Sequence, residues 1–243
     1  MKRIFAILYG TLCYLMFLAT FLYAVGFVGN MYVPKSIDSV IPGTHDNALL
    51  INMLLLSVFA IQHSVMARPA FKRWWTKFIP NAIERSTYVL LSNLALILLY
   101  WKWQPMNGVI WNIESTITGN IMWGLFWLGW VIVLISTFLI NHFELFGLQQ
   151  VYMNIKGEKI FTPTFKTPFL YKLVRHPIML GFIIAFWATP HMTVGHMLFA
   201  AASTGYILIA LQLEECDLVT YFGDRHIDYR RRVSMIIPIP KKM

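Results

Sequence analysis

Long apolar runs separated by short polar segments dominate the pattern of this chain. Three of them, residues 4–29, 48–67 and 119–141, are close to the length of about 20 residues that an α-helix needs to cross a bilayer. A shorter fourth run covers residues 86–101, and residues 178–213 form a double run with a break inside it. The pattern predicts an all-α integral membrane protein with four spanning helices and one divided apolar segment.

The divided segment predicts a helix–turn–helix hairpin in the membrane. Pro177 suits the first position of a helix and disfavours helix in the residue before it, so the first arm should begin there. From Pro177 to Thr189 the arm has 13 residues, about 20 Å, which is too short to span comfortably. Pro190 then breaks it, and a longer return arm runs to Leu213. We expect both ends of this hairpin, residues 177–213, to be cytosolic and the polar tail to form a cytosolic C-terminal helix.

Composition and charge restrict the class of protein further. Of 243 residues, 58% are hydrophobic and only 13% are charged, which excludes an ordinary soluble domain. If the amino terminus is cytosolic and the spans alternate, 18 of the 20 Lys and Arg residues fall on the cytosolic side, and only Lys35 and Lys102 fall outside. This bias follows the positive-inside rule and predicts a multi-pass protein of the bacterial inner membrane with both termini in the cytosol.

The net charge of +9 is explained mainly by this topology. Some basic residues are also expected to contact anionic membrane lipid. No motif for reading bases accompanies the charge, so we expect no nucleic-acid partner. Neither Cys13 nor Cys216 has the spacing of a redox or metal motif, and no cluster of metal ligands is visible, so we expect no metal. The sequence leaves the oligomeric state open.

Polar and ionisable residues gather at one expected level, the cytosolic ends of the apolar runs. Ionisable residues in membrane segments usually face a cavity or pair with one another. Five segments contribute them, namely Gln62-His63-Ser64, Glu84-Arg85-Ser86, Asn141-His142-Phe143-Glu144, Arg175-His176 and Glu214-Glu215. The pattern predicts one cytosol-facing polar pocket that carries out chemistry.

Several of these residues also have simpler explanations. His142 is equally well explained as a helix cap or as a group in interfacial water, and Glu84 with Arg85 as an interfacial ion pair. His63 lies about one turn inside its helix end, where position alone explains a polar group less well. His63 is therefore the strongest single candidate for chemistry.

Three short segments before and after the divided apolar run are rich in charged residues and also contain proline, glycine and tyrosine. They read Arg175-His176-Pro177-Ile178-Met179-Leu180-Gly181, Glu214-Glu215-Cys216-Asp217-Leu218 and Phe222-Gly223-Asp224-Arg225-His226-Ile227-Asp228-Tyr229. This resembles the integral-membrane methyltransferases that include isoprenylcysteine carboxyl methyltransferase and phospholipid methyltransferases. Met179 and His226 replace two tyrosines of that family's pattern, so the resemblance implies a cofactor-binding frame rather than a prenyl or phospholipid acceptor.

Four further segments, residues 21–27, 62–69, 83–88 and 141–147, look like those of the bacterial methanethiol S-methyltransferases. The resemblance covers nearly the whole chain. It implies methylation of methanethiol, a small volatile thiol, to dimethyl sulfide with S-adenosylmethionine as methyl donor. We expect one membrane methyltransferase domain over residues 1–243, with an N-terminal four-helix part at 1–141 and a cofactor-binding part at 142–243.

The resemblance also implies roles for the polar residues. Arg175 or Arg230 is expected near the carboxylate of the cofactor, and Glu214 or Glu215 at its amino group or ribose. The full set of expected cofactor-binding residues is Tyr171, Leu173, Val174, Arg175, His176, Glu214, Glu215, Tyr229 and Arg230.

The acceptor thiol must also lose its proton, because a free thiol with a pKa of about 8.5 is mostly neutral at pH 7. We expect His63 to act as the base and Arg85 or Tyr88 to stabilise the thiolate. His142 and Glu144 are the reserve catalytic candidates.

Other functions remain open on the sequence alone. Within methyltransferases, the acceptor could be hydrogen sulfide, another small thiol or a lipid. A haem-binding electron carrier would use histidines such as His63, His142 and His176 as axial ligands, although it leaves the Glu214-Glu215 pair without a role. A transporter would usually show inverted repeats and helices broken near the midplane.

Overall fold

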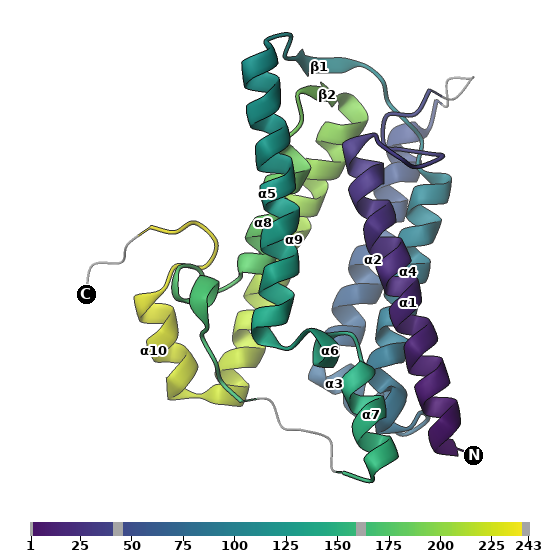
Figure 1. Ribbon diagram of the computed structural model, residues 1–243, viewed down its shortest axis with the longest axis vertical. Helices are drawn as coiled ribbons and strands as arrows, with labels where there is room; N and C mark the ends of the chain where they lie inside the picture. Colours follow the sequence, from purple (N-terminus) through teal and green to yellow (C-terminus); the bar gives the residue numbers. More distant parts are fainter. Residues whose placement is uncertain (1, 41–45, 159–163, 240–243) are drawn as a thin grey trace. The chain divides into compact units, whose positions relative to one another are not determined.

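The computed structural model describes residues 2–40, 46–158 and 164–239 and is mostly helical within them (Figure 1). By length and composition, five of its helices can cross a membrane: α1 (Lys2–Gly29), α2 (Ala48–Ala67), α4 (Asn81–Lys102), α5 (Thr116–Ile140) and α9 (Val194–Phe222). The shorter elements are α3 (Pro69–Trp75), α6 (His142–Leu145), α7 (Leu148–Lys156), α8 (Pro177–Trp187), α10 (Asp224–Arg232), a 3-10 turn at Phe169–Lys172, and the strands β1 (Val109–Asn112) and β2 (His191–Thr193). The prediction of an all-α integral membrane protein is confirmed.

The chain divides into two compact units, Met1–Met106 with Asn141–Thr162, and Asn107–Ile140 with Pro163–Met243. The fourth long helix, α5, therefore belongs with the hairpin helices rather than with α1, α2 and α4. The expectation of one methyltransferase domain over residues 1–243 stays a prediction.

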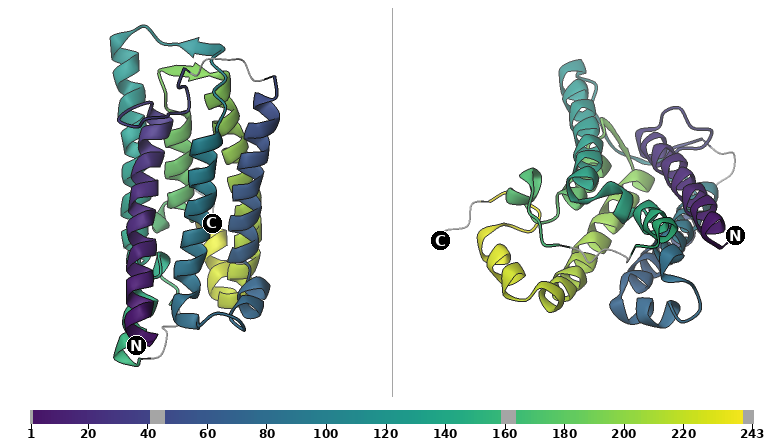
Figure 2. Two further views of the ribbon diagram at one scale, coloured as in Figure 1. Left: turned by 90° about the vertical axis from the view of Figure 1, so that its right-hand side faces the viewer. Right: turned by 60° about the horizontal axis from the view of Figure 1, so that its bottom comes forward.

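In the first unit, α1 and α2 pack against α4 (Figures 1 and 2). Helices α1 and α4 run in the same direction. Near one end the hydroxyl groups of Tyr9 and Thr87 lie 3.0 Å apart, and at the other Nζ of Lys35 donates to the carbonyl of Trp101 at 2.6 Å. The buried residues of α4 recur at helical spacing along one face, for example at Ala82, Ser86, Val89 and Asn93, and Tyr88 and Ser92 widen that buried face.

The segment after α5 also packs on α4. Gly147, between α6 and α7, has a φ of 90°, in the left-handed region that favours glycine. A Cβ atom there would lie 2.6 Å from Oγ of Ser86, so the close approach also requires glycine. Two segments far apart in the sequence, 83–88 and 141–147, thus lie against one another.

In the second unit, α5 and α8 cross at two glycines. A Cβ on Gly129 would lie 2.6 Å from the backbone nitrogen of Ala185, and one on Gly181 would lie 2.6 Å from the carbonyl oxygen of Gly129. Small residues at helix contacts let backbones approach closely in membranes. Gly181 ends the Arg-His-Pro pattern, so helix packing is the physical reason for glycine at that position.

A short antiparallel pair, β1 with β2, closes the turn between α8 and α9. Trp111 faces Met192 across the pair, and its indole nitrogen donates to the carbonyl of Thr189 at 3.1 Å. Thr193 then caps α9 by accepting a hydrogen bond from the amide three residues later. The sequence pattern did not predict these strands.

Helix α8 begins at Pro177, as predicted, and ends at Trp187, too short to cross a bilayer. Helix α9, however, continues to Phe222 instead of ending at Leu213. Polar residues after Leu213 end the apolar run but not the helix, which stops only at Gly223, where φ is 58°. Helix α10 follows directly, packed on α9, so the predicted helix in the tail is present.

Candidate functional site

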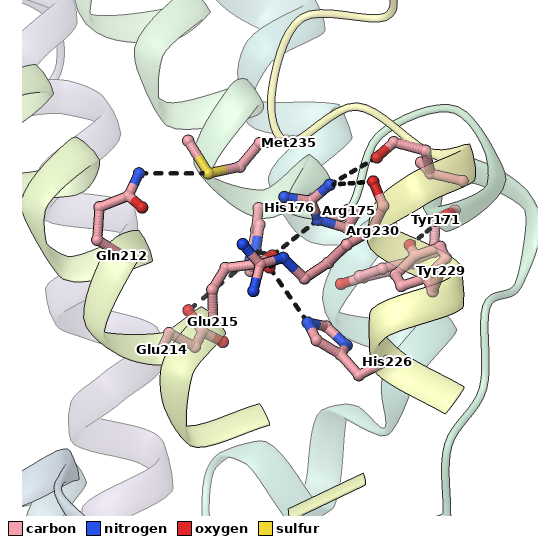
Figure 3. Close-up of polar contacts among 11 residues, drawn as sticks. Tyr171, Arg175, His176, Gln212, Glu214, Glu215, His226, Tyr229, Arg230 and Met235 are labelled. Atoms are coloured by element: carbon pink, nitrogen blue, oxygen red, sulfur yellow. Dashed lines mark hydrogen bonds and ion pairs between the residues drawn. The ribbon is translucent and has the colours of Figure 1, made fainter. Parts of the chain in front are cut away.

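A buried carboxylate on α9, Glu215, is the centre of a basic cluster in the second unit (Figure 3). It is 2% exposed. Its Oε1 accepts a hydrogen bond from Nε of Arg175 at 2.8 Å and lies 2.7 Å from Nε2 of His176. Its Oε2 lies 3.1 Å from Nε of Arg230 and 3.2 Å from Nε2 of His226. Four basic side chains thus surround one buried carboxylate, which would be costly to bury alone.

The same cluster fastens the chain after α10 to the start of α8. The backbone N–H of Arg175 donates to the carbonyl of Ser234 at 2.9 Å, and that of His176 to the carbonyl of Met235 at 3.1 Å. The guanidinium of Arg175 also donates to the carbonyl of Val233 at 2.6 Å. Because Arg175 is only 8% exposed and makes these bonds, its side chain holds protein rather than reaching outward.

Two tyrosines beside the cluster hold the backbone near it. The hydroxyl of Tyr229 donates to the backbone carbonyl of Tyr171, and the hydroxyl of Tyr171 donates to the carbonyl of Ser136 at 3.3 Å. Burial raises the pKa of Tyr229 to about 12. The phenol is therefore a protonated donor at neutral pH, suited to holding the backbone of the 3-10 turn.

Two of the predicted cofactor-binding residues, Glu214 and Arg230, form an accessible edge of this cluster, and a third, Leu173, is also exposed. The side chains of Glu214 and Arg230 are 46% and 45% exposed, and Leu173 is 59% exposed. Oε2 of Glu214 lies 3.8 Å from Nδ1 of His176. Val174 is buried and pairs through its backbone with the segment after α10. The predicted residues thus gather around Glu215, but with different access to a ligand.

His226 is a member of this cluster that the sequence did not assign to the site. It is 2% exposed, and its Nδ1 is a buried atom without a hydrogen-bond partner. The ring of Phe165 packs edge-on against it. Burial lowers the pKa of His226, although its contact with Glu215 acts in the opposite direction. The only sequence signal was that this histidine stands where the family pattern has tyrosine.

A second cluster lies in the first unit, where α2 meets α4. The hydroxyl of Tyr88 lies 2.8 Å from Nε2 and 3.0 Å from Nδ1 of His63. Oγ of Ser92 is 3.1 Å from Nδ1 of the same ring. Tyr88 and Ser92 are both 7% exposed, so the histidine faces two largely buried hydroxyl groups. Ser92 was not predicted, because a serine in an apolar helix carries no pattern of its own.

Arg85 brings a positive charge to this cluster. Its guanidinium carbon lies 5.1 Å from the centre of the Tyr88 ring, within the range of a cation–π contact. Its Nε donates to the carbonyl of Leu145 at 2.8 Å, which ties α4 to α6. The structure therefore brings together His63, Tyr88 and Arg85, the three residues predicted to handle the thiol.

The reserve candidates have local partners. His142 is 4% exposed, bonds the hydroxyl of Tyr14 through Nε2 at 2.9 Å, and packs edge-on against Phe17. Burial lowers the pKa of His142. The backbone N–H of Glu144 donates to the side chain of Asn141 at 3.3 Å, and its carboxylate accepts from the amide of Asn141 at 3.0 Å. Glu144 thus completes an N-terminal cap of α6, and catalytic roles for both residues stay predictions.

Apart from the reserve candidates His142 and Glu144, the predicted site residues therefore form two clusters, one within each unit. That they serve one cytosol-facing pocket stays a prediction. Among residues 2–40, 46–158 and 164–239, no group of three or more His, Cys, Asp and Glu side chains is arranged to hold a metal ion.

The fold and the clusters define a multi-pass membrane protein with buried ionisable groups near helix ends. The methanethiol S-methyltransferase of Mycobacterium tuberculosis is 56% identical, covering 100% of this chain and 99% of that protein. Methanethiol S-methyltransferase 2 of Bradyrhizobium diazoefficiens is also 56% identical, over 97% of this chain and 91% of its own length. This chain belongs to the methanethiol S-methyltransferase family, and the predicted resemblance and enzyme class are confirmed at that level.

The chain also has more distant similarities. The family described as NnrU protein matches residues 51–210. Nurim of Mus musculus is 28% identical over 69% of this chain and 66% of its own length. No solved structure matches the chain.

Proposed function

We propose that this protein methylates methanethiol to dimethyl sulfide with S-adenosylmethionine as methyl donor. The observation that carries the proposal is the 56% identity over the whole chain to a protein named methanethiol S-methyltransferase. The clusters around Glu215 and His63 support it, because they supply the two things that the reaction needs, a charged binding site and a base.

The cluster around Glu215 fits a zwitterionic donor. S-adenosylmethionine carries a carboxylate, an ammonium group and ribose hydroxyls, and when bound it supplies an electrophilic methyl group. Arg230 and Glu214 would hold its carboxylate and its ammonium group or ribose, because they are the charged side chains at the accessible edge. The buried, unpartnered Nδ1 of His226 supports a site for a polar ligand. Glu215 and Arg175 would position these groups instead of touching the donor.

The cluster around His63 suits removal of the thiol proton. The imidazole of His63 is the base, and the hydroxyl of Tyr88 lies within hydrogen-bonding distance of both of its ring nitrogens. The guanidinium of Arg85 at the Tyr88 ring favours negative charge nearby, which is the charge a thiolate carries. Apolar surroundings exclude water from the reacting groups.

The proposed orientation places both termini and the reaction in the cytosol of a bacterium, with the protein in the inner membrane. The excess of Lys and Arg on one side supports it. A volatile thiol partitions into lipid, while a charged donor arrives from water, so a site at the membrane edge suits both.

Headspace detection of dimethyl sulfide tests the proposal. Membranes that contain the protein are supplied with S-adenosylmethionine and methanethiol, with sulfide as a parallel acceptor and membranes without the protein as control. Dimethyl sulfide that depends on the protein and both reagents is the expected result. If the protein binds the donor but forms no product from methanethiol, methanethiol is refuted as the acceptor, and sulfide or larger acceptors are tested next.

A further inference from the structure

Ser92 contacts two of the catalytic candidates of the first unit, His63 and Tyr88. Its Oγ lies 3.0 Å from the backbone carbonyl oxygen of Tyr88, four residues earlier in α4, and 3.1 Å from Nδ1 of His63. Serine hydroxyls within helices commonly donate to the carbonyl four residues before them. The hydroxyl proton of Ser92 is thus directed to the backbone, which leaves its oxygen as an acceptor towards the histidine.

This contact determines which nitrogen of His63 carries the proton. A hydroxyl has one proton, so Ser92 can only accept from Nδ1 when it donates to the carbonyl of Tyr88. Nδ1 must then be the protonated nitrogen, a tautomer assigned from the hydrogen-bond network. The hydroxyl of Tyr88 lies 3.0 Å from Nδ1 and 2.8 Å from Nε2. With the proton on Nδ1 directed to Ser92, Nε2 keeps its lone pair and is the nitrogen that can accept from Tyr88.

We infer that Ser92 is a positioning residue, which holds His63 as the Nδ1–H tautomer and so makes Nε2 the base for the thiol. The inference rests on the proposed function. The S–H bond of the thiol breaks with its electron pair left on sulfur, and the proton passes to the oxygen of Tyr88. The hydroxyl proton of Tyr88 moves at the same time to Nε2, giving a thiolate and an imidazolium.

The arrangement explains why each partner is needed. A phenol oxygen can accept one proton while it donates another, so Tyr88 relays a proton from the thiol to His63 without itself becoming an anion. On α4, the hydroxyl of Tyr88 faces His63, and the guanidinium of Arg85 lies over the Tyr88 ring, where its positive charge favours the thiolate. Without Ser92, Nδ1 loses this acceptor for its proton, and the tautomer with the proton on Nε2, which cannot accept from Tyr88, is no longer disfavoured.

Nitrogen NMR tests the tautomer directly. The full-length protein is labelled with ¹⁵N-histidine in lipid, and the signal of His63 is identified by its absence from His63→Asn. We expect a protonated Nδ1 and an unprotonated Nε2 in the unsubstituted protein, and the reverse in Ser92→Ala. An unsubstituted protein with the proton on Nε2 would overturn the inference, whatever the enzyme activity.

Kinetics with two thiols test the role in proton removal. Ser92→Ala should lower kcat for methanethiol at least about tenfold without changing donor affinity. Ser92→Thr keeps the hydroxyl and should retain most of the rate. Ser92→Val has the shape of threonine without the hydroxyl and should not. With trifluoroethanethiol, a stronger acid, the loss in Ser92→Ala should shrink to less than about threefold, because less help is needed to remove the proton.

Thr20→Ala is the matched control, because Thr20 is a buried residue of α1 in the same unit whose hydroxyl, like that of Ser92, donates to the carbonyl four residues earlier, here that of Met16 at 2.8 Å. Its rate should stay within about twofold. Equal rates in Ser92→Thr and Ser92→Val, or a loss of kcat in Ser92→Ala that is the same for both thiols, would show that Ser92 contributes only to packing. Absence of any methylated product from the unsubstituted protein would refute the proposed function, and the NMR result would still decide the tautomer.

Discussion

Replacing Glu215 by glutamine tests whether this carboxylate holds the second unit together. The amide keeps an oxygen for Arg175 at the Oε1 position but removes the negative charge. At the Oε2 position its NH₂ group meets Nε of Arg230 and Nε2 of His226, which lie 3.1 and 3.2 Å from that atom. Hydrogen bonds to charged groups are each worth about 1.5–3 kcal/mol, and the half-exposed Arg230 can recover part of its loss in water. We expect a loss of about 3 kcal/mol, or about 6–12 °C in Tm for a chain of this size.

Thermal unfolding in detergent measures this effect, with Glu214→Gln as the matched control. Glu214 precedes Glu215, is 46% exposed and has a 3.8 Å contact with His176, so its substitution should cost less than about 1 kcal/mol. Calorimetric titration with S-adenosylmethionine should show the opposite order, with an affinity loss of about 10- to 100-fold in Glu214→Gln. An unchanged Tm in Glu215→Gln would refute the structural role. Normal donor affinity in both variants would refute the donor site.

Three further predictions concern packing, pH and catalysis. Gly129→Ala should lower the free energy of unfolding by about 1–3 kcal/mol, because its Cβ would lie 2.6 Å from backbone, whereas Gly124→Ala, with nothing within 4 Å, should be neutral or stabilising; equal Tm values would contradict the close crossing. Burial lowers the pKa of His226 from its ordinary 6.5, so the unfolded state takes up a proton first as pH falls. Tm should therefore drop between about pH 7 and about pH 5.5, and drop less in His226→Gln; an equal drop in both proteins would exclude this histidine as the cause. His63→Ala should lower kcat at least about 100-fold with unchanged donor affinity, and unchanged turnover would rule it out as the base.

Helices were predictable from the sequence where apolar length or proline determines them. Helix α2 spans Ala48–Ala67, the limits of its apolar run, and α8 begins at Pro177. Helix α4 begins at Asn81, a full turn before its apolar run, because the polar residues after Pro80 are compatible with helix. Hydropathy marks where a chain leaves lipid, whereas a helix such as α9 ends where the backbone can no longer continue it, here at Gly223. The two limits differ whenever a helix continues into water.

The candidate site was predictable in part for a similar reason. Arg175, His176 and Glu215 were expected together because charged groups at the edges of an apolar hairpin must find partners. Ser92 and His226 were not, because their contacts depend on which face of α4 or α10 each occupies. That face is set by tertiary packing, which leaves no trace in the order of apolar and polar residues.

The adjacent glutamates of α9 show how one short motif can serve two purposes. Successive residues of an α-helix point about 100° apart, so two neighbouring carboxylates cannot face the same group equally. Here the second carboxylate is 2% exposed and surrounded by four basic side chains, while the side chain of the first is 46% exposed. The buried member gathers Arg175, His176, His226 and Arg230, which fixes the direction of the groups at the edge. The exposed member can then offer its charge to a ligand, so loss of Glu214 should weaken binding and loss of Glu215 should weaken the structure that makes binding possible.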